Sequence, residues 1–226
     1  MADSYFTIIK EGRGLFKEKM SKFLSFAFFV RTADEAKSRI KEIQNEYHDS
    51  RHVCWAYMIG PDRLEWQLND NGEPSGTAGK PILGQINSFG LTDIVVIVVR
   101  YFGGIKLGTP GLIAAYREAA RLALEDAGKK EVHKTERVKI SFPYVSSNDV
   151  MKLVKSEEVE VLEKIFDNAC EMTLEFREDF AERIQGRLEK IDGVSFLEYF
   201  STSSSIKKKK VFNSFFQFFH ILYIRY

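Results

Sequence analysis

The stretch IVVIVVRYFGGIKLGTPG, residues 94–111, joins an unbroken apolar run to a glycine-rich turn and then to a helix. Residues 94–99 are all apolar and mostly β-branched, which predicts a strand covered on both faces at the centre of a sheet. The glycines that follow permit tight turns and a close approach of a ligand to the backbone. Thr109 is positioned to cap the helix, and Pro110 suits its first turn.

This turn has the features of an anion site. A helix N-terminus carries unpaired N–H groups and a partial positive charge, and Arg100 and Lys106 add two full charges beside it. Tyr101 and Phe102 offer aromatic surfaces, of which we expect one to point outward and stack on a base. A competing interpretation assigns the glycines to turns and packing alone. The predicted phosphate or nucleic-acid contacts are Lys80, Arg100, Tyr101, Gly103, Gly104, Lys106, Gly108, Gly111 and Arg117.

A second segment, DNGEPSGTAG at residues 70–79, consists of turn formers and is too long for a simple connector. We therefore expect it to carry function. Asp70 and Glu73 have the chemistry for proton transfer or magnesium binding. The alternative, which we prefer, is that they are solvated turn carboxylates, with Asp70 closing an Asx turn. The loop residues predicted to border the site are Glu73, Pro74, Ser75, Gly76 and Thr77.

His52 and Cys54 are two residues apart on a predicted strand, so their side chains point to one face. Such a pair can act as a nucleophile with its base. A free cysteine is usually buried, however, and a histidine on a strand is usually packed and hydrogen-bonded, so we prefer the structural interpretation. Together with Asp70 and Glu73, these residues complete the set of catalytic candidates.

Composition and motifs exclude several classes of function. Two cysteines, Cys54 and Cys170, form no C-x-x-C pair, so the sequence predicts a reducing cytoplasm and no metal site. Pro74 and Pro81 stand where a P-loop needs glycine and Ser or Thr, and the turn does not match G-x-G-x-x-G. We therefore expect no cofactor. Residues 131–205 hold 16 acidic against 10 basic side chains, which argues against a chain that coats nucleic acid over its whole surface.

The patterns predict an α+β protein of two domains. Residues 1–130 form the first domain and hold both glycine-rich segments. Residues 131–205 read strand, helix, strand, strand, helix, strand, the βαββαβ order of ferredoxin-like domains. Residues 206–226 are rich in lysine and phenylalanine, and we expect them to belong to neither fold.

Several spaced segments resemble the YigZ/IMPACT family. They are DNGEPSGTAGKP at residues 70–81, VVRYFGGIKLG at residues 98–108, and HVCWA at residues 52–56. The resemblance covers roughly residues 15–128 and implies a first domain like the second domain of a small-subunit ribosomal protein. The block from 134 to 204 looks like the second domain of the bacterial YigZ branch, which is similar to the last domain of elongation factor G.

The resemblance also implies a link to the regulation of translation, without a settled reaction. Our leading hypothesis is a cytoplasmic, non-enzymatic regulatory protein that binds RNA or a ribosome-associated partner through a phosphate-reading groove on its first domain. The alternatives are a hydrolase or phosphotransferase acting on a small phosphorylated or nucleotide substrate at the same loops, and a purely protein-binding module. No segment reaches the ~20 consecutive apolar residues that span a bilayer, so we expect no integral membrane association. The sequence leaves the oligomeric state open.

Overall fold

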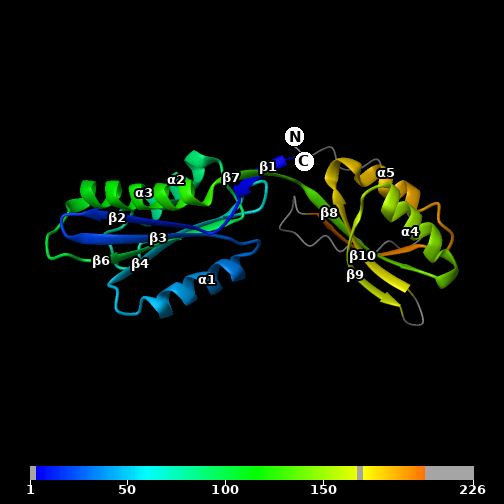
Figure 1. The fold of residues 1–226 in the computed structure, drawn as a ribbon, viewed down its shortest axis with the longest axis horizontal. Coiled ribbons are helices and arrows are strands. Elements are labelled where there is room, and N and C mark those ends of the chain that lie inside the picture. Colours follow the sequence, from blue (N-terminus) through cyan, green and yellow to red (C-terminus); the bar gives the residue numbers. More distant parts are fainter. Residues whose placement is uncertain (1–3, 167–169, 202–226) are drawn as a thin grey trace, which may run out of the picture. The chain divides into compact units, whose positions relative to one another are not determined.

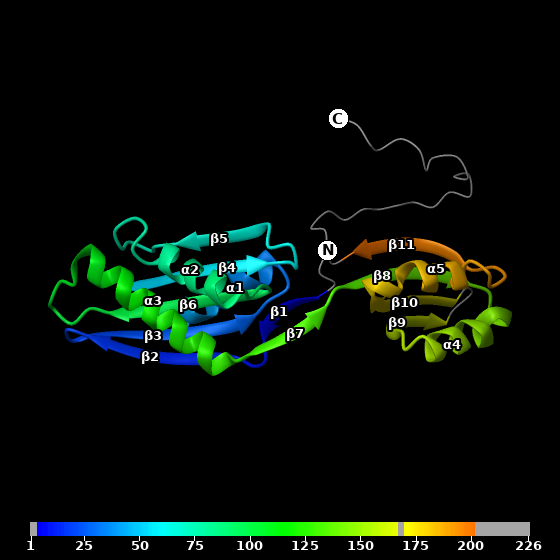
Figure 2. The ribbon, with the colours of Figure 1, turned by 90° about the horizontal axis from the view of Figure 1, so that it is seen from above.

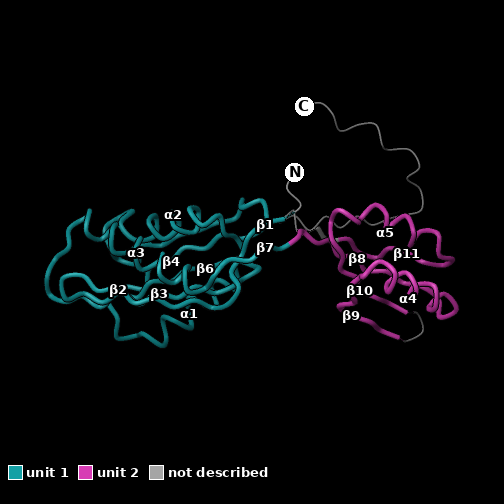
Figure 3. The backbone as a smooth tube through the Cα atoms, turned by 45° about the horizontal axis from the view of Figure 1, so that its top comes forward, with its two compact units in different colours: residues 1–132 teal, residues 133–226 magenta. Residues whose placement is uncertain are grey.

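The computed structural model describes residues 4–166 and 170–201, so the predicted tail at 206–226 lies outside the described residues. The chain is α+β and divides into two compact units, residues 1–132 and residues 133–226 (Figure 3). Among the described residues, no helix has both the length and the apolar character needed to cross a membrane.

The first unit is built on a five-stranded sheet in which all neighbouring strands are antiparallel, in the order β2-β3-β6-β4-β5 (Figure 2). A separate two-stranded sheet pairs β1 with β7. The elements in chain order are β1 (Ser4–Ile8), β2 (Gly12–Glu18), β3 (Ser21–Phe29), α1 (Ala33–Glu46), β4 (His52–Ile59), β5 (Glu65–Asn69), α2 (Gly79–Phe89), β6 (Ile94–Tyr101), α3 (Gly108–Ala127) and β7 (Lys129–His133).

Strand β6 is the centre of the five-stranded sheet, and this prediction is confirmed. All residues from Ile94 to Val99 are fully buried, because α2 and α3 cover one face of the sheet and α1 covers the other (Figure 1). Val96 and Val98 pack in the cluster that contains α3, whereas Val95 and Ile97 pack in the cluster that contains α1. Two covered faces explain why the run is apolar throughout instead of alternating.

The second unit is a four-stranded antiparallel sheet in the order β11-β8-β10-β9, with α4 and α5 packed into one core against it. The strands and longer helices follow the order βαββαβ along the chain. Its likeness to the last domain of elongation factor G stays a prediction, as does the likeness of the first unit to a ribosomal protein domain. The elements are β8 (Thr135–Phe142), η1 (Tyr144–Ser146), α4 (Ser147–Ser156), β9 (Glu160–Phe166), β10 (Cys170–Arg177), η2 (Glu178–Phe180), α5 (Ala181–Leu188) and β11 (Ser195–Ser201).

One carboxyl group lies in the apolar row of the second unit. Side chains of β8 alternate between the core and the surface, and Glu136 is buried on the same face as Val138 and Ile140. Its Oε2 atom has no hydrogen-bond partner among the described residues. Burial, and to a smaller extent the charge of Glu178, raises the pKa of Glu136 from 4.5 to about 7.

Replacing Glu136 by glutamine is therefore expected to stabilise the second unit above neutral pH by about 2 kcal/mol. The folded carboxyl binds its proton more tightly than the unfolded one, so wild-type stability falls as the pH rises from 4.5 through about 7. Urea unfolding at about pH 6 and about pH 8, followed by NMR signals of β8 and β10, measures this change. The exposed Glu163→Gln is the control and should behave as wild type. Equal wild-type stability at the two pH values would contradict the prediction.

Candidate anion-binding site

A cavity of about 530 Å³ opens in the first unit where β6 ends and α3 begins. Four segments line it: the start of β4, the loop before α2, the end of β6, and the turn into α3. The predicted glycine turn and the predicted loop therefore meet at one site. The lining residues are Arg51, His52, Glu73, Pro74, Arg100, Phe102, Lys106, Leu107, Gly108, Thr109 and Leu112.

The turn into α3 leaves the start of this helix open to the cavity. Gly104 and Gly108 have φ angles of 87° and 71°, in the left-handed region that favours glycine. A Cβ atom on Gly103 would lie 2.1 Å from the backbone carbonyl carbon of Met20, so a larger residue does not fit there. No side chain among the described residues caps α3. The prediction that Thr109 caps it is wrong, because the helix already begins at Gly108.

The loop before α2 folds around the carboxylate of Asp70. Oδ1 accepts hydrogen bonds from the backbone N–H groups of Ala78 at 3.0 Å and Gly79 at 2.8 Å, and Oδ2 accepts one from Gly76 at 2.8 Å. Burial raises the pKa of Asp70, but these N–H groups and the Lys80 ammonium outweigh burial, so the net pKa is below its usual value. Asp70 is thus bound to the backbone of its own loop and to the start of α2, which agrees with the preferred interpretation as a turn carboxylate and not with the alternative of a proton carrier or magnesium ligand.

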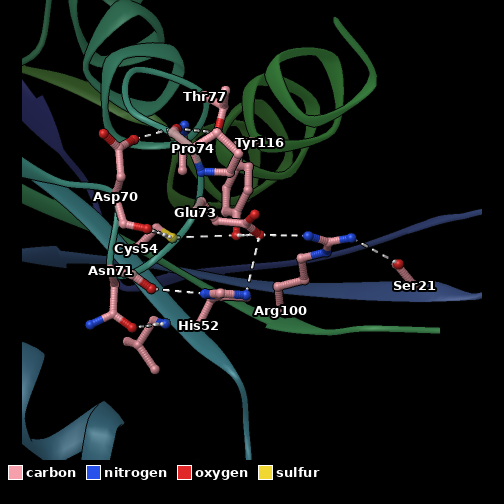
Figure 4. Close-up of polar contacts among 12 residues, drawn as sticks. Ser21, His52, Cys54, Asp70, Asn71, Glu73, Pro74, Thr77, Arg100 and Tyr116 are labelled. Atoms are coloured by element: carbon pink, nitrogen blue, oxygen red, sulfur yellow. Dashed lines mark hydrogen bonds and ion pairs between the residues drawn. The ribbon is translucent and has the colours of Figure 1, made fainter. Parts of the chain in front are cut away.

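Glu73 and Arg100 form a buried ion pair beside the cavity (Figure 4). Arg100 Nη1 donates to Glu73 Oε1 over 2.6 Å, and the two side chains are 6% and 4% exposed. The Tyr116 hydroxyl donates to the same oxygen at 2.9 Å, and Arg100 Nη2 lies 3.4 Å from Ser21 Oγ. Two predictions are therefore corrected. Arg100 is not a free phosphate contact, because a carboxylate compensates its charge, and Glu73 is not a solvated turn residue.

His52 and Cys54 do not form a nucleophile and its base. His52 Nδ1 lies 2.8 Å from the carbonyl oxygen of Asn71, which can only accept, so Nδ1 carries the proton. His52 Nε2 lies 3.9 Å from Glu73 Oε1. Cys54 Sγ donates to the carbonyl oxygen of Asp70 at 3.0 Å, and burial above all raises the pKa of the thiol to about 12. A thiol of this kind stays protonated, so Cys54 has a structural role.

Comparison with known proteins identifies the chain. Residues 19–124 match the family model of the Impact N-terminal domain. An IMPACT family member of Haemophilus influenzae is 35% identical over 182 residues, an alignment that covers 75% of this chain and 87% of the relative. The chain belongs to the IMPACT family.

Other members of the IMPACT family match shorter parts of the chain. YvyE of Bacillus subtilis is 40% identical over 131 residues, covering 58% of this chain and 60% of YvyE. YigZ of Escherichia coli is 40% identical over 108 residues, covering 47% of this chain and 53% of YigZ. A crystal structure of a hypothetical protein superposes with a TM-score of 0.70 at 24% identity, covering 87% of this chain and 97% of that one, so the two share a fold. The predicted family is confirmed.

In this IMPACT family member, one of the two aromatic residues after the central strand reaches the cavity. Phe102 lines it, is 42% exposed, and lies with its ring centre 5.4 Å from the Arg100 guanidinium. Tyr101 packs on the opposite face of the sheet and donates its hydroxyl to Asp49 at 2.7 Å, a bond that raises the pKa of Tyr101 to about 12. Phe102, and not the predicted Tyr101, is therefore the available stacking surface.

Lys80 and Arg117 lie at a second cavity of about 330 Å³, between α2 and α3. The prediction that Lys80, Arg117 and Lys106 share one basic groove is therefore wrong. Lys106 lines the first cavity, and Lys80 and Arg117 line the second. Neither cavity is lined by the predicted contact Gly111, which lies in the first turn of α3. The second cavity is lined by Gly76, Lys80, Pro81, Gly84, Gln85, Ile113 and Arg117.

The remaining loop residues border or brace the two cavities. Pro74 lines the first cavity and Gly76 the second. Thr77 is buried and donates its hydroxyl to the carbonyl oxygen of Pro74 at 2.7 Å, which holds the loop closed, while Ser75 is exposed. Within residues 4–166 and 170–201, no group of His, Cys, Asp and Glu side chains is arranged to hold a metal ion.

Among the residues that sequence reasoning did not assign to the site, Arg51 and Tyr116 contribute a charge and a hydrogen bond. Arg51 lines the cavity. It directly precedes the family-like segment at 52–56, and this position in the sequence indicates that it lies near the site. Tyr116 fits the apolar face of its helix, so nothing in its spacing indicates that its hydroxyl reaches Glu73.

Proposed function

We propose that this protein is a cytoplasmic regulator of translation that binds RNA, and that the cavity at the start of α3 receives a phosphate of the RNA backbone. Membership of the IMPACT family supports a role related to translation only at the level of the family. The choice of RNA as partner rests on the chemistry of the cavity.

The proposal is carried by a helix start and two cations that have neither a side-chain cap nor a carboxylate partner among the described residues. Lys106 and Arg51 are exposed, line the cavity, and form no ion pair with any other described residue. Unpaired N–H groups at a helix start and nearby side-chain cations both attract phosphate. The Arg100–Glu73 pair adds little net charge, so these groups dominate the positive character of the cavity.

The same cavity has room and a surface for a nucleotide. A volume of about 530 Å³ lies within the range of small-molecule sites. The exposed ring of Phe102 offers a face on which an unpaired base can stack, a contact that every base can make. A phosphate site beside an aromatic face suits single-stranded RNA.

Replacing Lys106 by alanine is expected to weaken RNA binding about tenfold and to lower the slope of log affinity against log salt by about 1. Fluorescence anisotropy with a labelled oligouridylate of about 12 nucleotides, repeated at several salt concentrations, measures both quantities. Lys41→Ala is the matched control, because it removes the same charge from an exposed lysine of α1, the helix on the opposite face of the sheet. This control should bind as wild type.

Two results would count against the proposal. An affinity that does not change with salt, or equal affinities of wild type and Lys106→Ala, would overturn the phosphate contact. Capture of a ribosome-associated protein that survives nuclease digestion, without any binding of oligouridylate, would favour the protein-binding alternative.

A further inference from the structure

The cavity presents a hydrogen-bond acceptor as well as cations. Every contact that the structure gives the Glu73 carboxylate goes to Oε1: Arg100 Nη1 at 2.6 Å, the Tyr116 hydroxyl at 2.9 Å and His52 Nε2 at 3.9 Å (Figure 4). Oε2 makes no hydrogen bond to any described residue, and Glu73 lines the cavity. One oxygen of this carboxylate is therefore left for a ligand.

Residues from two elements hold this carboxylate in place through hydrogen bonds, Arg100 from β6 and Tyr116 from α3. The ring of His52 on β4 lies beside it and is itself fixed by the carbonyl oxygen of Asn71 at 2.8 Å. The Glu73 side chain is 4% exposed, so it lacks the freedom of a surface glutamate. Its free oxygen is consequently a preorganised acceptor, which loses little entropy when a ligand binds.

A carboxylate beside a phosphate site restricts which ligands fit. It repels a second anion, so a complementary ligand places its phosphate near Lys106 and a hydrogen-bond donor against Oε2. A ribonucleotide has such a donor, because its 2′-hydroxyl lies on the sugar that carries the phosphate, and DNA lacks this group. An acceptor left without a donor in the closed complex costs about 1–3 kcal/mol.

We infer that Glu73 Oε2 accepts a hydrogen bond from a ribose 2′-hydroxyl and thereby makes the cavity select RNA over DNA. The inference rests on the proposed function, since it needs a phosphate bound near Lys106. Glu73 is then the residue that determines specificity, whereas Lys106 and Arg51 supply affinity.

The test compares four labelled oligomers of one sequence on the full chain: oligouridylate, oligodeoxyuridylate, and the 2′-O-methyl and 2′-fluoro forms of the RNA. The last two keep an RNA-like sugar but lack the hydroxyl donor, so they separate the hydrogen bond from the shape of the backbone. We expect oligouridylate to bind about tenfold or more tightly than each of the others.

Glu73→Gln extends the test to the protein side. The oxygen of the new amide can accept the hydrogen bonds from Arg100 and Tyr116, so its NH2 group points toward the cavity. This NH2 group is a donor and can bind a 2′-fluorine or a 2′-hydroxyl oxygen, so the ligand no longer needs a 2′ proton. The ratio of affinities for RNA and 2′-fluoro RNA should therefore fall toward 1. Glu42→Gln on α1, an exposed glutamate, should keep the wild-type ratio. Tryptophan fluorescence shows whether each variant is folded.

The outcomes separate this inference from the proposed function. Equal affinities for all four oligomers, with salt dependence and the Lys106→Ala effect intact, would overturn the hydroxyl contact and leave the phosphate site standing. Binding of no oligomer would overturn both. If Glu73→Gln does not fold, the four-oligomer comparison on the wild-type chain still decides.

Discussion

Replacing Glu73 by alanine is expected to lower the free energy of unfolding of the first unit by about 3–5 kcal/mol. The substitution leaves the guanidinium of Arg100, 6% exposed, without the carboxylate that lies 2.6 Å away. The Tyr116 hydroxyl loses its acceptor at the same time. An uncompensated charge and an unpaired donor in the core cost far more than the loss of a surface contact.

Two further variants separate charge from packing. The double variant Glu73→Ala/Arg100→Met removes both charges and should be nearly as stable as wild type. The methionine side chain is apolar and long enough to fill the space of the aliphatic part of Arg100. Glu118→Ala is the matched control, because it breaks the partly exposed ion pair with Arg121. Surface pairs of this kind contribute below about 1 kcal/mol.

Tryptophan fluorescence is the suitable measurement because both tryptophans, Trp55 and Trp66, lie in the first unit. A urea titration followed by fluorescence therefore reports on this unit, although the chain contains a second one. If Glu73→Ala loses no more stability than Glu118→Ala, the buried ion pair does not support the fold in the way proposed.

Removing the Asp70 carboxylate is expected to destabilise the first unit by about 3 kcal/mol. The backbone N–H groups of Gly76, Ala78 and Gly79 lose their shared acceptor, and two of these groups begin α2. Asp70→Asn keeps one side-chain oxygen and should recover part of the loss. Because Glu73 belongs to the same loop, Asp70→Ala should also weaken the preference for RNA over DNA.

The acid side of the stability profile tests the Asp70 contribution independently. The pKa of Asp70 in the folded chain is below its ordinary value of 3.8. Its stabilising effect is therefore complete above this value and is lost as the pH falls through the lower folded pKa. Below about pH 4, wild type should lose stability more steeply than Asp70→Ala. Asp34→Ala is the control, because Asp34 is an exposed residue in the first turn of α1, and its stability should change with pH as that of wild type does. Stabilities of wild type and Asp70→Ala that fall in parallel below about pH 4 would refute the prediction.

Local sequence patterns were sufficient to predict the elements that frame the site. The unbroken apolar run at 94–99 indicated a strand buried on both faces, and β6 is that strand. The glycines after it indicated a sharp turn into a helix, and Gly104 and Gly108 adopt the left-handed backbone that such a turn needs. These signals are readable because side-chain periodicity and backbone freedom depend on neighbours in the chain.

The same reasoning failed for the electrostatics of the site. Arg100 was predicted to face a phosphate, but Glu73 from the loop before α2 compensates its charge. Lys80 and Arg117 were expected in the groove that holds Lys106, and they lie at a separate cavity. No local pattern in the sequence pairs residues this far apart in the chain.

By itself, the sequence determined the family, the buried central strand with its glycine turn, the order of strands and helices in residues 135–201, and the segment in which the cavity lies. Only the tertiary structure decided which charges neutralise one another and which remain free for a ligand. The register that sets His52 of β4 opposite Arg100 of β6, and the loop that carries Glu73 over both, create an ion pair between Glu73 and Arg100. Among the residues that the structure describes, Lys106 and Arg51 have no such partner. The physical reason is that helix and strand propensity acts over a few residues, whereas ion pairing depends on distance in space and on burial, which exist only once the chain has folded.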